Sequence, residues 1–183
     1  MIKHNGGGHH EWPSLRALDR LLEGLARITE WACHALLLVI VGVTVMQVAL
    51  RFLLNRPTSW SEEVALLCLV WFGMLAVALG VREHGHIAIT ALRDALPRVP
   101  ALALDILAEL LVLAFALFLM IKGGDLVSLA GAQILPASQL PKLWLYLPAS
   151  VGGALMALNA LGNLLLGRWS PPVPEASPPE ALT

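Results

Sequence analysis

The chain has 183 residues, of which 57% are hydrophobic and only 14% are charged, and its formal net charge is −1. Soluble domains usually carry about 25% charged residues, so this deficit and a mean hydropathy of +0.73 indicate an integral membrane protein. A near-neutral chain also lacks the basic surface that nucleic-acid binding requires. The two cysteines, Cys33 and Cys68, lie in apolar surroundings and form no C-x-x-C pair, so they suggest neither a zinc site nor a disulfide framework.

The N-terminal region divides into two predicted segments. Residues 1–12 are polar and rich in Gly and His, which predicts a disordered tail rather than a signal peptide. Residues 13–30 alternate apolar and charged positions at helical spacing, which predicts an amphipathic helix on the membrane surface. The alternative is that this segment extends the first span beyond the bilayer. The apolar face consists of Leu15, Leu18, Leu21, Leu22, Leu25 and Ile28.

Four apolar stretches follow, each near the ~20 residues that a helix needs to cross a hydrocarbon core of ~30 Å. We therefore predict an all-α integral membrane protein in which four transmembrane helices follow the amphipathic interfacial helix. The predicted spans are 31–50, 62–81, 101–121 and 143–167, which together form a membrane domain over 31–167. Small residues such as Gly152 and Gly153 would let the fourth span pack closely against another helix. Gln47, Ser150 and Asn159 are expected to form hydrogen bonds between helices.

The basic residues predict the orientation of these spans. Eight Lys and Arg residues lie in the N-terminal segment, the 82–100 loop and the C-terminal tail, against four in the 51–63 and 122–142 loops. The positive-inside rule then places both termini in the cytoplasm and the 122–142 loop outside. Residues 168–183 are rich in Pro and acidic, which predicts a disordered tail.

A tryptophan and two adjacent acids, Trp60, Glu62 and Glu63, precede the second apolar run. Ser59 followed by Glu62 matches a capping box, and a helix N-terminus favours acidic side chains in its first turn. Local physics thus explains where the acids lie but not why there are two. Their candidate partners are Arg51 and Arg56 of this chain or a residue of another subunit.

A second pair of acids, Asp105 and Glu109, is spaced by one helical turn within the third span. An acid inside a membrane is a candidate functional site, although pairing with a basic residue of a neighbouring helix is the simpler interpretation. Histidines at matching depth, His34 with His84 or His86, leave open a haem-binding membrane anchor. No nucleophile–base pair, phosphate loop or metal cluster is present in the sequence, so we predict neither enzymatic activity nor a cofactor. A small channel acting alone is a further alternative.

The segment NRPTSWSEEVALLCLVWFGMLAVALGVREHGHIAITALRDALP closely resembles the signature of one membrane-protein family. This family is the small membrane subunit, DctQ-like, of tripartite ATP-independent periplasmic (TRAP) transporters. The resemblance covers roughly residues 30 to 167, although Asp105 and Glu109 are not part of it. The matching positions are Trp60, Glu62, Glu63, Trp71, Gly73, Arg82, His86, Ile87, Leu96 and Pro97.

The resemblance implies a subunit of a transporter in the bacterial inner membrane. In such systems a periplasmic protein captures an organic acid, and a large membrane subunit carries it across, usually driven by sodium. The small subunit is expected to widen the scaffold of the large one without holding substrate or ion. The matching residues, among them Trp71, Gly73, Arg82 and His86, would then be structural or lie at the subunit interface, and membrane lipids would surround the complex.

Overall fold

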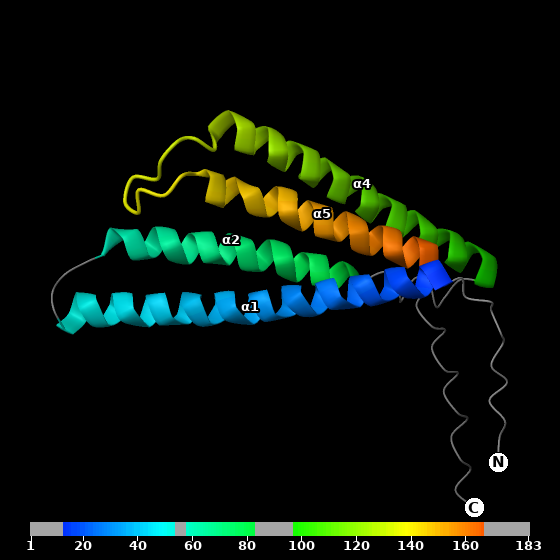
Figure 1. Cartoon of the computed structure of the whole chain (residues 1–183), viewed down its shortest axis with the longest axis horizontal. Coiled ribbons are helices and arrows are strands. Elements are labelled where there is room, and N and C mark those ends of the chain that lie inside the picture. Colours follow the sequence, from blue (N-terminus) through cyan, green and yellow to red (C-terminus); the bar gives the residue numbers. More distant parts are fainter. Residues whose placement is uncertain (1–12, 54–57, 83–96, 167–183) are drawn as a thin grey trace, which may run out of the picture.

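A computed structural model describes residues 13–53, 58–82 and 97–166 of the chain, and these ranges contain four long apolar helices and no strand (Figure 1). The prediction of an all-α membrane protein with four membrane-crossing helices is confirmed. Residues 1–12 and 168–183, where we predict tails, lie outside the described ranges. The helices are α1 (Pro13–Leu53), α2 (Ser59–Arg82), α4 (Arg98–Ala130) and α5 (Leu143–Leu166).

The helices lie side by side in the order α1, α2, α5, α4 (Figure 1). Helix α5 packs against α4 along its length and against α2, while α2 packs in turn against α1. A shorter contact joins α1 to the end of α5. Since α5 lies between α2 and α4, it is the helix that holds the row together, and α1 and α4 form its two edges.

Glycines of α5 allow the neighbouring helices to approach closely. A Cβ atom added at Gly152 would lie 2.9 Å from Met74 of α2, and one at Gly153 would lie 2.6 Å from the backbone nitrogen of Met120 in α4. One at Gly162 would overlap Leu22 of α1. Glycine is therefore required on three sides of the helix, each facing a different neighbour. The small and flexible side chains Ala78, Val81, Ala116, Met156 and Ala160 fill the core between them.

Helix α1 continues without a break past residue 30, where the sequence predicted a boundary between a surface helix and the first span. Its 41 residues make it about 60 Å long, twice the ~30 Å of a hydrocarbon core. Leu22 is 5% exposed and packs on α5, so part of the predicted apolar face contacts protein. The continuous helix favours the alternative of an extended first span, and a location on the membrane surface remains a prediction.

Helix α4 extends beyond its predicted end at residue 121 to Ala130, so the predicted outer loop 122–142 begins only at residue 131. Glycines at 123 and 124 suggested a loop, but Gly123 lies so close to the backbone of Ser150 that a Cβ atom would be 2.6 Å from its nitrogen. Packing of α4 on α5 outweighs the low helix propensity of glycine. The spans that we predicted at 62–81 and 143–167 match α2 and α5 within three residues at each end.

We expect Gly153→Ala to destabilise the chain by about 1–3 kcal/mol, because the added methyl group would push α4 away from α5. Thermal unfolding of the purified chain in detergent, followed by tryptophan fluorescence, would measure the effect. Gly73→Ala is the matched control, since a Cβ atom there would meet nothing within 4 Å. Equal melting temperatures for the two variants would contradict this account of the packing.

Candidate functional site

The start of α2 is shaped by hydrogen bonds between Thr58 and Ser61. The helix begins at Ser59, which makes Thr58 the N-cap residue. The hydroxyl of Ser61 donates to the carbonyl oxygen of Thr58 at 2.6 Å, and the two hydroxyl oxygens are 2.9 Å apart. Ser61 is fully buried. The predicted capping box of Ser59 and Glu62 is wrong, because Ser59 is already the first residue of the helix. The Glu62 side chain makes a contact outside its own helix.

The carboxylate of Glu62 joins α2 to α1. Its Oε1 atom accepts a hydrogen bond of 2.9 Å from the Nε2 atom of Gln47, which confirms the prediction that Gln47 bonds across helices. Gln47 lies in the last two turns of α1 and Glu62 in the first turn of α2. The bond thus fixes the two helix ends on either side of the 54–58 connection.

The carboxylate of Glu63 binds the tip of the loop between α4 and α5. Its Oε1 accepts from the backbone N–H of Ala137 at 3.0 Å, and its Oε2 accepts from that of Ser138 at 2.7 Å. The loop is pinched by an antiparallel bridge between Ile134 and Pro141. Charge-assisted bonds to two consecutive amides hold both position and orientation. Glu63 therefore has a partner within this chain, the two loop amides, which the sequence did not suggest. Of the two arginines that we considered, Arg56 lies outside the described residues.

Trp71 completes a hydrogen bond that a proline removes from α5. Pro148 lies inside the helix and is almost fully buried. It has no N–H to donate to the carbonyl of Trp144, four residues earlier. The Nε1 atom of Trp71 donates to that carbonyl from α2 at 3.0 Å. Such bonds matter in a membrane, where water cannot satisfy a freed carbonyl. At Gly73, two residues on, an added Cβ atom would meet no other helix within 4 Å in the described part of the chain.

Two asparagines of α5 bind the other end of α2. The Nδ2 atom of Asn159 donates to the carbonyl of Ala78 at 2.9 Å, and that of Asn163 donates to the carbonyl of Val81 at 3.0 Å. Val81 lies in the last turn of α2, where carbonyls have no partner within the helix. The prediction for Asn159 is confirmed, as is that for Ser150, whose hydroxyl donates to the carbonyl of Met120 at 3.1 Å.

Glu109 is buried beside the contact of Asn163 with the end of α2, with an exposed fraction of 5%. Its Oε1 atom lies 3.2 Å from the Nδ2 atom of Asn163, so an amide is one of its partners, where the sequence suggested a basic residue. Asp105, one turn earlier, is half-buried. Sequence reasoning missed Asn163, although its spacing of four residues from Asn159 placed both on one helix face.

Arg82 ends α2 and lines a groove of about 640 Å³ between α1 and α2. His34 also lines this groove, and its Nδ1 atom donates to the carbonyl of Glu30 at 2.8 Å. The histidines that could join it as haem ligands, His84 and His86, lie outside the described residues. Within the described ranges, no three His, Cys, Asp or Glu side chains gather as metal ligands would.

Comparison with known proteins identifies the family. Residues 40–168 match the family model described as tripartite ATP-independent periplasmic transporters, DctQ component. The chain belongs to this family. It is 27% identical to the sialic acid TRAP transporter small permease protein SiaQ of Vibrio cholerae, over 82% of this chain and 85% of the relative. It is 25% identical to a putative TRAP transporter small permease protein of Haemophilus influenzae, over 73% and 77%.

A third relative matches over a shorter stretch. The sialic acid TRAP transporter permease protein SiaT of Haemophilus influenzae is 34% identical over 71 residues, which are 39% of this chain and 12% of the relative. Membership of the DctQ family makes this chain a multi-pass subunit of a membrane transporter and not an enzyme. The hydrogen bonds that link α2 to its neighbours are therefore elements of a transporter subunit.

Replacing Glu63 by Gln should weaken the attachment of the loop between α4 and α5. Replacing Glu62 by Gln should weaken its bond to Gln47 less. A Gln side chain offers one acceptor oxygen, so at Glu63 it would set an NH2 group against one of the two backbone N–H groups. At Glu62 the single oxygen still suffices for Gln47. Hydrogen exchange of the Ala137 and Ser138 amides should be faster in E63Q and unchanged in E62Q. Equal exchange in both variants would contradict the role given to Glu63.

Trp71→Phe should destabilise the chain by about 1–3 kcal/mol, because it leaves the carbonyl of Trp144 without a donor. In a Pro148→Ala background the restored N–H can serve that carbonyl, so the same change should cost less. A double-mutant cycle of unfolding free energies in detergent would measure this coupling. Trp60→Phe, at a tryptophan that is 41% exposed, controls for the loss of an indole. An identical cost of Trp71→Phe in both backgrounds would contradict the proposed bond.

Proposed function

We propose that this chain is the small membrane subunit of a sodium-gradient-driven TRAP transporter for organic acids and acts as a scaffold for a large membrane subunit. One observation carries the proposal: polar side chains between the helices bind backbone groups of neighbouring helices. Trp71, Asn159 and Ser150 each donate to a carbonyl of another helix. Groups used in this way stabilise a fixed arrangement, as a scaffold requires, and a transport pathway needs polar groups that face a moving solute.

The relatives support a large partner. In the SiaT permease protein the similar stretch is only 12% of the chain, so a segment like this one is joined there to a far longer polypeptide. The small permease SiaQ, in contrast, is covered over 85% of its length. We infer that this chain binds a large permease as a separate subunit, and that a periplasmic solute-binding protein completes the tripartite system. The relatives' sialic acid is one member of the organic-acid class that we propose.

The proposed location is the bacterial inner membrane, within its lipids and with both termini in the cytoplasm. The N-terminal end of α1, the Arg82 end of α2, the Arg98 end of α4 and the C-terminal end of α5 lie at one end of the row (Figure 1). Among the described residues, the arginines in the N-terminal half of α1, at the end of α2 and at the start of α4 belong to this end: Arg16, Arg20, Arg27, Arg82 and Arg98. Positive-inside bias would therefore set this end in the cytoplasm and the Glu63 joint on the periplasmic side.

Reconstitution tests the function directly. Proteoliposomes that contain this chain and its large permease partner, with the binding protein added outside, should take up an organic acid when a sodium gradient is imposed. We expect no uptake with either membrane subunit alone or without the gradient. Uptake by this chain alone would contradict the proposal, as would full activity of the large permease without it.

The E62Q/E63Q double variant tests the scaffold role within that system. Both acids hold elements of this chain in place, so we expect lower recovery of the complex and slower uptake. The number of sodium ions per solute should stay the same, because a scaffold binds neither. Single-turnover uptake with labelled sodium and solute would measure that ratio. A changed ratio in an intact complex would show that these acids take part in coupling.

A further inference from the structure

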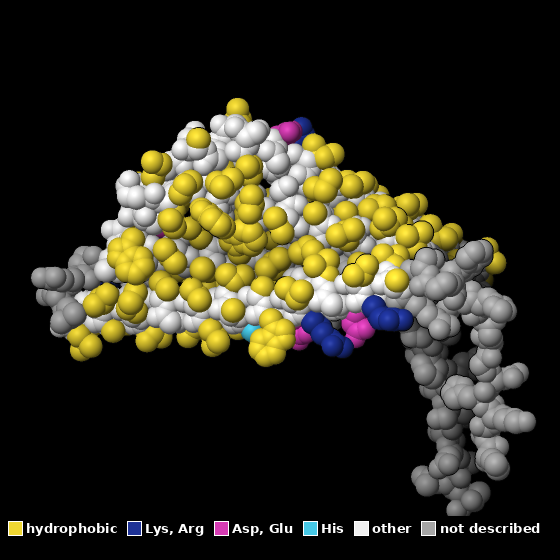
Figure 2. All heavy atoms as spheres, in the orientation of Figure 1, with side chains coloured by type: hydrophobic (Ala, Val, Ile, Leu, Met, Phe, Trp, Pro, Cys, Tyr) yellow, Lys and Arg dark blue, Asp and Glu magenta, His cyan; other side chains and the backbone are white. Residues whose placement is uncertain are grey.

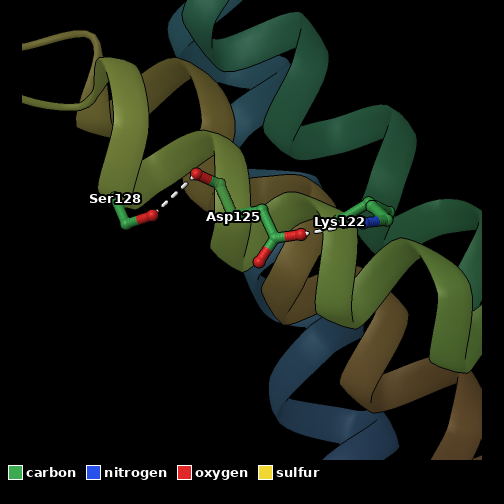
Figure 3. Close-up of polar contacts among 3 residues, drawn as sticks. All are labelled: Lys122, Asp125 and Ser128. Carbon is green, nitrogen blue, oxygen red and sulfur yellow. Dashed lines mark hydrogen bonds and ion pairs between the residues drawn. The ribbon is translucent and has the colours of Figure 1, made fainter.

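An ion pair lies exposed on the outer side of α4. The Nζ atom of Lys122 is 3.0 Å from the Oδ2 atom of Asp125, and the carbonyl oxygen of Asp125 accepts from the hydroxyl of Ser128 at 2.8 Å (Figure 3). The two charged side chains are 59% and 62% exposed. In the space-filling view, acidic and basic atoms lie together at the upper edge of the molecule, on the α4 side, with hydrophobic and white atoms beside them (Figure 2). Lys122 and Asp125 take no part in the contacts between helices described above.

Helix packing places the ion pair of Lys122 and Asp125 at a level where α2 and α5 have no charged residue. Gly123 contacts the backbone of Ser150, and Gly152 contacts Met74. Lys122 therefore lies at about the level of Met74, about two-thirds of the way along α2 from its start at Ser59. At about 1.5 Å per residue this level is about 10 Å from the outer end of α5 and about 12 Å from the Arg82 end of α2. Neither α5, which packs on α4, nor α2 beyond it carries a charge at this level, since α2 is uncharged over 64–81 and α5 throughout.

A bilayer around this row would bring the pair against hydrocarbon. Charged side chains inside a membrane almost always face protein or a water-filled cavity, because lipid cannot solvate them. Lys has three donors and a carboxylate has about four acceptor sites. One mutual contact leaves most of these groups to be satisfied from outside. The exposed fractions show that the chain itself does not cover them.

The opposite edge of the row has a different character. Helix α1 carries no charged residue from 31 to 50, and its exposed side chains there include Leu38 at 73% and Val45 at 62%. Such a surface suits lipid. On both edge helices, exposed apolar side chains recur at intervals of three, four and seven residues, but on α4 the ion pair falls within this series, whereas on α1 the series is uncharged over 31–50. This α4 stripe consists of Leu111, Phe115, Phe118, Lys122, Asp125 and Leu129.

We propose that the α4 stripe is the surface on which the large permease subunit docks. A transmembrane helix of that subunit would cover the apolar positions and offer polar groups to Lys122 and Asp125, whereas the α1 edge faces lipid. This inference rests on the proposed function and adds to it the side of the row that binds. A polar pair within an apolar contact would also fix the register of the two helices, as single polar residues do in coiled coils.

The decisive variant exchanges the two charges. K122D/D125K keeps an ion pair within α4 at the same spacing and leaves the apolar positions unchanged, so the fold of the chain is preserved. A large subunit that binds Lys122 with one group and Asp125 with another would lose both of these contacts in the variant. We expect recovery of the tagged large permease with this chain from co-expressing cells to fall about tenfold, as for a central interface contact. The melting temperature of the variant chain alone should match that of the wild type.

Apolar positions provide the matched comparison. Phe118→Ala and Leu111→Ala on α4 should lower recovery of the large permease, whereas Leu38→Ala and Val45→Ala on α1, at similar exposure, should not. Wild-type recovery with K122D/D125K, or loss confined to the α1 variants, would overturn the assignment of the α4 edge and leave the proposed function intact. Failure of the wild-type chain to recover any large permease would instead overturn the proposed function, and this inference with it.

Discussion

Backbone carbonyls without a donor are the constraint on which this structure depends, because a bilayer offers no water to satisfy them. Helix α5 creates one such carbonyl at Trp144 through Pro148, and α2 creates another at Val81 where it ends. In both places a side chain of the neighbouring helix supplies the donor. The bonds run in opposite directions, one from α2 to α5 and one from α5 to α2. The two helices are thereby fixed at two depths, which sets their register as well as their contact.

The acids at the start of α2 also bind polar groups of other elements, at the end of the row where the chain leaves the bilayer core. Glu62 holds the end of α1, and Glu63 holds the loop that connects α4 to α5. Each acid therefore ties α2 to a different part of the row. The two partners, the end of α1 and the loop between α4 and α5, lie on different sides of α2, so each is bound by an acid of its own. A pair of adjacent acids is thus explained by two neighbours on two sides of one helix turn, and the motif needs no catalytic role.

Much of this could be predicted from the sequence, because long apolar runs bounded by charges set the helices and glycine spacing set the close contacts of α5. The prediction was wrong where tertiary packing overrides local propensity. Gly123 looked like a loop residue, yet it is helical because only glycine fits against Ser150. The partner of Glu63 lies 74 residues away in a loop whose shape depends on its own bridge. No local pattern contains that distance. The order of the helices was likewise beyond the sequence, since it depends on which side of α5 each glycine faces.

An open row of helices also differs from a closed bundle in what it exposes. A closed bundle hides its polar groups in the centre, whereas a row presents two long edges that need not be alike. Here one edge is uncharged over the whole of 31–50, and the other carries a lysine and an aspartate at the level where its neighbours are uncharged. The scaffold role that we propose would use this asymmetry, with lipid against the uncharged edge and the large subunit against the charged one. On this view the contacts of α5 with α2 and α4 hold α4, the outermost helix, at a fixed angle and depth. The α4 stripe, which has few polar contacts, can then bind its partner in one register.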